Sequence, residues 1–146
     1  FLYNPIHTIS AAWSVAMPFS YDEPLSLAQV PYNETIVNLG GHWNEEEYYF
    51  QAPVSGIYYI TVTAGVKAGK MAFLNVRVNL DIRAKLVRTS TVHNGNDLIS
   101  RSLITHVQKG DWVYVSSEAT TALYGTNLRE TSFSGFLLFP LEKLKQ

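Results

Sequence analysis

FQAPVSGIYY, from Phe50 to Tyr59, joins a turn to the start of an aromatic-rich strand. Pro53, Ser55 and Gly56 favour a turn, and the residues that follow alternate in character as far as Ala64. One set contains Tyr58, Ile60, Val62 and Ala64, and the other contains Ile57, Tyr59, Thr61 and Thr63. A period of two predicts a β-strand with two distinct faces. We expect the neighbouring segments to pair with this strand.

The rest of the chain consists of short extended segments separated by turns such as Asn94–Asp97 and Lys109–Asp111. Strands are predicted at Ile9–Val15, Val30–Asn38, Tyr48–Ala52, Ala72–Leu80, Ala84–Thr91, Leu98–Val107, Trp112–Ser117 and Phe133–Phe139. The solvent face of Ala72–Leu80 is predicted to carry Phe73, Asn75, Arg77 and Asn79. No segment shows a helical period, so the pattern predicts an all-β protein, an antiparallel β-sandwich or jelly roll.

Size and composition limit the possible classes of protein. The chain has 146 residues, a net charge of −1 and no cysteine, which suits one domain over 9–141 with tails at 1–8 and 142–146. The mixed charges provide no basic stripe for nucleic acid, and no apolar run predicts membrane insertion. The lack of cysteine excludes disulfides, thiolate zinc sites and a cysteine nucleophile.

A glycosylation sequon supports secretion, and the first residue bears on processing. Asn33-Glu34-Thr35 is the only glycosylation sequon, with Asn33 as its acceptor. Phe1 stands where a start methionine would be expected, which indicates a mature product or an excised domain.

The predicted last strand is apolar on both faces. Phe133, Gly135, Leu137 and Phe139 alternate with Phe136 and Leu138, and Tyr59 is a large aromatic on the second face of its own strand. The outer face of a two-layer sandwich normally meets water, so this second apolar face needs a cover. Either a subunit interface or a loop of the same chain could provide it.

Three motifs match a known family in the right order. The first comprises Tyr32, Asn38, Trp43, Phe50, Gly56, Tyr58, Ile60 and Val62; the second is Lys109–Asp111; the third is FSGFLLFP at Phe133–Pro140. Their spacing resembles that of the globular head domain of the complement C1q family, a relative of the tumour necrosis factor fold. Tyr32, Ile60 and Val62 depart from the family pattern but keep apolar or aromatic character.

The resemblance implies a ten-stranded jelly roll that assembles as a homotrimer, with Tyr59, Phe136 and Leu138 near the subunit interface. It also implies a secreted, non-enzymatic domain that binds glycans, microbial surfaces or proteins multivalently. The leading expectation is innate immune pattern recognition. A receptor-clustering signalling or adhesion ligand, and a structural component of the extracellular matrix, are the alternatives. The four histidines lie on separate segments without metal-ligand spacing, so catalysis is not expected.

Two segments are candidate ligand-binding sites. Trp112 and Tyr114 should face outward, because Val113 and Val115 between them would face the core. An exposed Trp112 could stack on a sugar or anchor a protein, although it could equally pack against a neighbouring subunit.

The polar loop from Gly125 to Glu130 offers Asn127 and Arg129, and Arg129 could pair with a carboxylate such as that of sialic acid. The alternative for Arg129 is an ordinary solvated arginine, which is also expected of Lys85, Arg88 and Arg101.

A calcium ion is the one cofactor that the sequence suggests. Asn94, Asn96 and Asp97 offer oxygen ligands on one turn. The resemblance implies that calcium can bind near the trimer apex, where three-fold symmetry would triple these oxygens. The alternative is an ordinary Asn-Gly turn.

Overall fold

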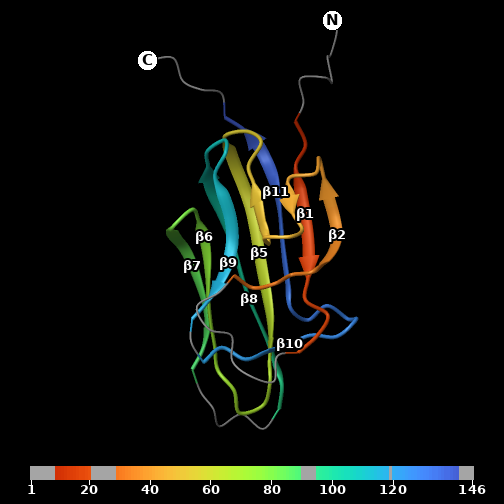
Figure 1. The fold of residues 1–146 in the computed structure, drawn as a ribbon. Coiled ribbons are helices and arrows are strands. Elements are labelled where there is room, and N and C mark those ends of the chain that lie inside the picture. Colours follow the sequence, from red (N-terminus) through yellow and green to blue (C-terminus); the bar gives the residue numbers. More distant parts are fainter. Residues whose placement is uncertain (1–8, 21–28, 90–94, 119, 142–146) are drawn as a thin grey trace, which may run out of the picture.

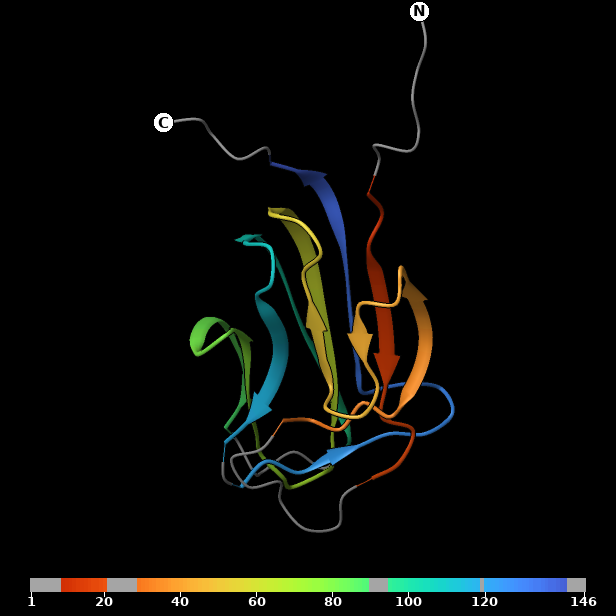
Figure 2. The same ribbon diagram turned by 45° about the horizontal axis from the view of Figure 1, so that its top comes forward.

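The computed structural model describes residues 9–20, 29–89, 95–118 and 120–141, in which eleven strands form two facing antiparallel sheets (Figures 1 and 2). The first sheet contains β1 (Ala12–Ala16), β2 (Glu34–Leu39), β5 (Gly56–Val66), β8 (Asp97–Val107), β10 (Leu123–Tyr124) and β11 (Ser132–Pro140). The second contains β3 (Trp43–Asn44), β4 (Tyr49–Gln51), β6 (Ala72–Val78), β7 (Asp81–Arg88) and β9 (Trp112–Ser117). The all-β jelly-roll prediction is confirmed, with eleven strands in place of ten.

β5 is the central strand of the first sheet. It pairs along its whole length with β8 on one side. On the other side it pairs with β11 and, near its end, with β10, and the sheet continues from β11 through β1 to β2. Tyr58, Ile60, Val62 and Ala64 are buried on its inner face, while Tyr59 and Thr61 lie on its outer face. The alternation that predicted this strand is therefore confirmed.

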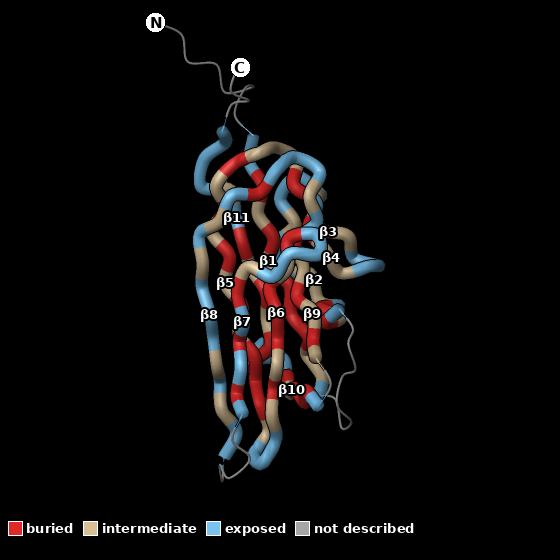
Figure 3. The backbone as a smooth tube through the Cα atoms, turned by 90° about the vertical axis from the view of Figure 1, so that its left-hand side faces the viewer, coloured by how far each residue is buried: buried red, intermediate tan, exposed pale blue. Residues whose placement is uncertain are grey.

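The core is centred on an aromatic cluster that joins the two sheets. Trp13 of β1 stacks on Phe50 of β4 with ring centroids 4.0 Å apart, and it meets Phe133 of β11 edge-on at 5.4 Å. The Trp13 ring also covers Gly135, where an added Cβ would lie 2.3 Å from the indole. Trp13 and Trp43 are both buried, as structural residues should be. Figure 3 shows the buried inner faces of the strands.

Several strand boundaries differ from the predictions. β2 begins at Glu34, well after Pro31, and β7 spans Asp81–Arg88 in place of Ala84–Thr91. The β6–β7 hairpin turns sharply, because Asn79 adopts a left-handed backbone conformation with φ of 55° and Val78 pairs directly with Asp81. β3 and β10 were not predicted, since two-residue strands leave no periodicity to detect.

The predicted environment is wrong for three side chains. A β-bulge between Leu137 and Phe139 reverses the alternation, so Phe139 is exposed and does not share the inner face of Phe133. Asn75, predicted to face solvent, is buried and donates to Glu118 Oε2 at 3.1 Å. Arg88, predicted to be solvated, is only 6% exposed and donates to the carbonyl of Val66 at 3.1 Å.

β1 begins and β11 ends at the same end of the sandwich (Figure 1), because the two strands are antiparallel neighbours. The amide of Leu137 donates to the carbonyl of Ala11 at 3.0 Å, which extends the ladder beyond β1. Within the residues described, no helix is long and apolar enough to span a membrane.

Candidate functional site

The outer face of the first sheet carries a continuous apolar row. Leu39, Ala12, Phe136, Tyr59 and Ile104 are direct cross-strand neighbours from β2 to β8. We call these five residues the apolar row. The rings of Tyr59 and Phe136 lie 5.6 Å apart, and Ile104 is 64% exposed. Apolar side chains aligned across a whole sheet, four of the five being large, are unusual on the surface of a monomer.

A row of hydroxyl groups runs beside the apolar row. Ser14 and Ser134 share a hydrogen bond of 2.8 Å, and Ser102 donates to Thr61 at 3.0 Å. The hydroxyl of Tyr59 donates to Ser102 at 3.1 Å and so links the two rows. These hydroxyls already have partners, so this face could enter an interface without leaving them unpaired.

The sequence predicted Tyr59, Phe136 and Leu138 at an interface. The structure brings Tyr59 and Phe136 into contact in the apolar row. Leu138 lies in the bulge of β11 and is exposed, as is Phe139 beside it. Both extend the apolar surface toward the end of β11.

Trp112 and Tyr114 point outward from β9, on the second sheet. Trp112 is 44% exposed, and its ring stacks on Tyr49 with centroids 4.3 Å apart and planes 17° apart. The hydroxyl of Tyr114 donates to the carbonyl of Asn79 at 2.7 Å. Trp112 therefore has one stacked face and retains exposed aromatic surface, on the side of the sandwich opposite the apolar row.

Arg129 has a partner within its own chain. Its Nε and Nη2 atoms each donate to a different carboxylate oxygen of Glu34 at 3.1 Å, which makes the ion pair bidentate. An external carboxylate would have to compete with Glu34 for this guanidinium. Asn127 is exposed in the same loop. Within the described residues, no hydrogen bond or ring contact joins this loop to Trp112, so the structure does not combine the two candidate sites.

The predicted calcium ligands are engaged by protein groups. The side-chain oxygen of Asn96 accepts from the amide of Ala68 at 2.9 Å, and Asp97 Oδ2 lies 3.5 Å from Arg88 Nη1. Asn94 lies outside the described residues. In the part of the chain that the structure describes, no three His, Cys, Asp or Glu side chains are placed to hold a metal ion. Calcium binding at this turn stays a prediction, and a ligand there would have to compete with these two contacts.

A cavity of about 430 Å³ lies beside Tyr49 and was missed by sequence reasoning. Its lining includes His42, Gln51 and Lys109. Lys109 belongs to a motif that indicated the fold, but nothing local in the sequence links it to His42. The acceptor of the glycosylation sequon, Asn33, is exposed just before β2, and its modification stays a prediction.

The two-sheet fold matches the jelly roll of C1q and tumour necrosis factor domains, as solved structures show. The globular domain of zebrafish complement 1qA superposes with a TM-score of 0.72 at 19% identity, covering 90% of this chain and 99% of that one. Eiger TNF from S. frugiperda superposes with a TM-score of 0.68 at 12% identity, covering 94% and 97%.

Within this class, the C1q domain family model matches residues 12–138, and the chain belongs to this family. It is 32% identical to human complement C1q tumor necrosis factor-related protein 2 over 137 residues, which is 91% of this chain and 46% of that protein. It is 29% identical over 117 residues to a polypeptide of the mouse complement C1q subcomponent, covering 80% of this chain and 46% of the relative. The chain thus spans about half the length of these relatives.

Membership of the family confirms the resemblance on which the sequence predictions relied. It also confirms that the domain is a non-enzymatic module of a binding or signalling family.

Proposed function

We propose that this chain is a secreted recognition head that works as a homotrimer. The observation that carries the proposal is the apolar row, which crosses the whole outer face of the first sheet. Water would contact this row in a monomer, whereas a closed three-fold assembly would bury three copies against one another. The hydroxyl row beside it has internal hydrogen bonds, so burial would leave these groups paired.

The trimer is tested by measuring mass in solution. A chain of 16.4 kDa should give a particle three times as heavy, about 49 kDa, in light scattering at micromolar concentration. Ile104→Glu places a charge in the apolar row and should produce a monomer, because an unpaired charge is costly to bury. Leu80→Glu is the matched control, since Leu80 is 84% exposed in the β6–β7 turn. A wild-type mass of 16.4 kDa would contradict the proposal.

The ligand that we propose is a repeated glycan on a microbial or cell surface, bound through Trp112 in an innate immune role. Three heads in fixed geometry gain avidity of about 10²–10⁴ over one head when the ligand is repeated. The exposed surface of Trp112, on the sheet opposite the apolar row, supports this role because aromatic rings can stack on sugars.

A glycan array tests the ligand class. Wild-type protein should bind a defined set of sugars, and Trp112→Ala should lose that binding. Trp112→Phe keeps a ring that can stack on Tyr49, so this variant should retain most of the sugar binding. An array on which Trp112→Ala and wild type bind alike would remove Trp112 from the site.

A receptor-clustering signalling ligand is the second candidate function. It is favoured by the similarity to a tumor necrosis factor-related protein over 91% of this chain. An empty glycan array together with tight binding to one cell-surface protein would support this function over glycan recognition.

A further inference from the structure

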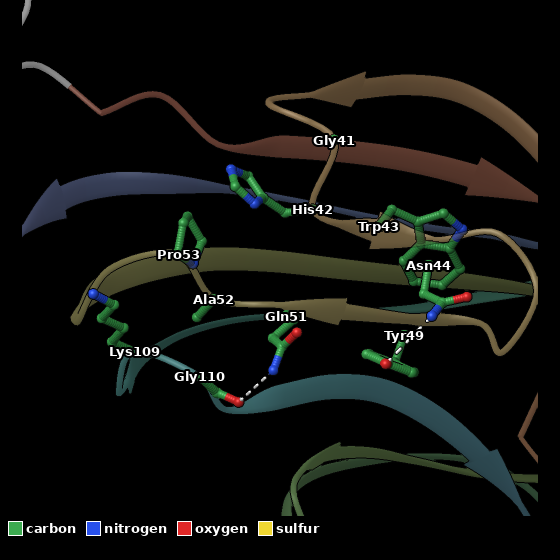
Figure 4. Close-up of a pocket in the computed structure, with 10 residues that line it drawn as sticks. All are labelled: Gly41, His42, Trp43, Asn44, Tyr49, Gln51, Ala52, Pro53, Lys109 and Gly110. Atoms are coloured by element: carbon green, nitrogen blue, oxygen red, sulfur yellow. Dashed lines mark hydrogen bonds between the residues drawn. The ribbon is translucent and has the colours of Figure 1, made fainter.

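The cavity beside Tyr49 combines features of a binding site that the sequence motifs do not indicate. It lies where the β2–β3 turn, β4 and the β8–β9 turn meet. Figure 4 shows His42, Pro53 and Lys109 at one end of the cavity, and Asn44 and Tyr49 at the other. Its volume of about 430 Å³ is in the range that accommodates a small ligand.

Backbone hydrogen bonds hold the rim of the cavity in place. The amide of Gln51 donates to the carbonyl of His42 at 2.9 Å, which fixes the β2–β3 turn against β4. On the other side, the amide of Gly110 donates to the carbonyl of Ala52 at 2.8 Å, and the amide of Lys109 donates to Ser55 Oγ at 2.9 Å. The polar side chains therefore project from a fixed frame, which lowers the entropy cost of binding.

The electrostatic character of the cavity favours an anion. Among the described residues, the side chains of Lys109 and His42 make no hydrogen bond or ion pair, and no carboxylate lines the cavity. Asp111, close to Lys109 in the chain, accepts from Asn79 and from the amide of Gln108, both at 3.0 Å. Gln51 donates to the carbonyl of Gly110 at 3.3 Å, which leaves its side-chain oxygen as an acceptor.

Three other cations on the surface of the domain differ from Lys109 in this respect. Arg83 pairs with Asp81 at 2.9 Å, and Lys85 pairs with Glu118 at 3.3 Å. Arg129 pairs with Glu34 at 3.1 Å. Those cations are neutralised within the chain, whereas the charge of Lys109 stays available to a ligand.

An aromatic platform borders the same cavity. Tyr49 lines it, and Trp112 stacks on Tyr49 and is the direct cross-strand neighbour of Gln51. Aromatic rings at the surface, next to an amide and a cation, match the chemistry of a sugar. A sugar has an apolar face, hydroxyl groups and, in acidic sugars, a negative charge.

We infer that this cavity binds an acidic sugar, with its carboxylate or sulfate toward Lys109 and His42. Gln51 accepts a hydrogen bond from a hydroxyl, and the ring of the sugar packs on the platform of Tyr49 and Trp112. The inference rests on the proposed glycan recognition and names its chemical class.

The test compares three probes by calorimetry: 3′-sialyllactose with a carboxylate, 3′-sulfated lactose, and neutral lactose. Removing the charge in Lys109→Gln should weaken binding of both acidic probes about tenfold, since charge-assisted hydrogen bonds are roughly twice as strong as neutral ones. Lys109→Arg should restore it. Lys70→Gln removes the same charge from an exposed lysine in the β5–β6 turn and should change nothing. The stronger acidic probe identifies the preferred anion.

The outcomes separate this inference from the proposed function. Acidic probes that bind Lys109→Gln as well as wild type would overturn the inference, while glycan recognition would stand. Lactose that binds as tightly as the acidic probes would also overturn the inference and leave glycan recognition standing. If an array binds no sugar at all, both the inference and the proposed glycan recognition fail. Binding of an acidic peptide in place of acidic sugars would also overturn the inference.

Discussion

Two buried tyrosines of this domain differ in whether the hydroxyl group has a partner. Tyr58 is fully buried and donates to the carbonyl of Val54 at 2.7 Å. Tyr32 is 1% exposed, and its hydroxyl has no hydrogen-bond partner in the described structure. A buried polar group without a partner destabilises a fold, whereas a satisfied one does not.

The same substitution should therefore have opposite effects at the two positions. Tyr58→Phe removes a hydrogen bond and leaves the Val54 carbonyl without its partner, which should cost about 1 kcal/mol of unfolding free energy. Tyr32→Phe removes an unpaired hydroxyl and should be neutral or stabilising by up to about 1 kcal/mol. Urea denaturation of both variants measures this. An equal loss of stability at both positions would contradict the argument.

Alkaline pH should destabilise the domain through the same residues. Burial raises the pKa of Tyr58 to about 12, and it also raises the pKa of Tyr32. An unfolded tyrosine ionises near pH 10, so above that pH the unfolded state binds fewer protons than the folded state. Stability is then complete below about pH 10 and falls by up to about 1.4 kcal/mol per pH unit for each such tyrosine.

Urea midpoints between pH 9 and 11 measure this slope. Tyr32→Phe should make the slope shallower, because one of the two raised pKa values is gone. A slope unchanged in this variant would mean that Tyr32 does not contribute.

At the scale of elements, the pairing of β1 with β11 depends on one close approach. The ring of Trp13 lies directly over Gly135, its cross-strand neighbour. Gly135→Ala would place a methyl group 2.3 Å from the indole, which should cost about 1–3 kcal/mol by overpacking. Gly95→Ala is the control, since no atom of the described residues lies within 4 Å of an added Cβ there. Equal thermal stability of the two variants would refute this role of Gly135.

Elements with a long regular pattern could be predicted from the sequence. β5 and β9 were found by alternation, and the outward placement of Trp112 followed from the same pattern. The two-residue strands and the bulge in β11 were not predicted, because their pairing depends on partners distant in sequence.

The site was harder to predict than the strands. Arg129 meets Glu34, and Lys109 lines a cavity with His42, through contacts that only the folded chain creates. Neither pair leaves a local pattern in the sequence. Arg88 looked solvated for the same reason, since its burial comes from carbonyls of another strand and from Asp97.

For the whole molecule, the two outer faces of the sandwich have different chemistry. The first sheet presents the apolar row, and the second presents Trp112 beside a cavity that no carboxylate of the described residues lines. Self-association through one sheet would therefore leave the proposed ligand site of the other sheet in contact with solvent. Assembly and recognition could then operate together without competing for surface.

Calcium dependence should require the assembled state. Asn96 and Asp97 of one chain already contact Ala68 and Arg88, so we propose that a calcium site at this turn draws oxygens from several protomers. Calcium is expected to raise the melting temperature of the wild-type protein relative to chelator, because a ligand stabilises the state that binds it. Ile104→Glu should abolish the shift. Identical melting temperatures of wild-type protein in calcium and in chelator would disprove calcium binding.

The shared end of β1 and β11 has a mechanical consequence. Because these strands are antiparallel neighbours, force applied across the start of β1 and the end of β11 pulls them apart from that end. Their hydrogen bonds, beginning with the one between Leu137 and Ala11, then break one after another and do not share the load. A sandwich stretched in this direction loses these hydrogen bonds in sequence. It therefore unfolds at a lower force than a sandwich sheared along its strands.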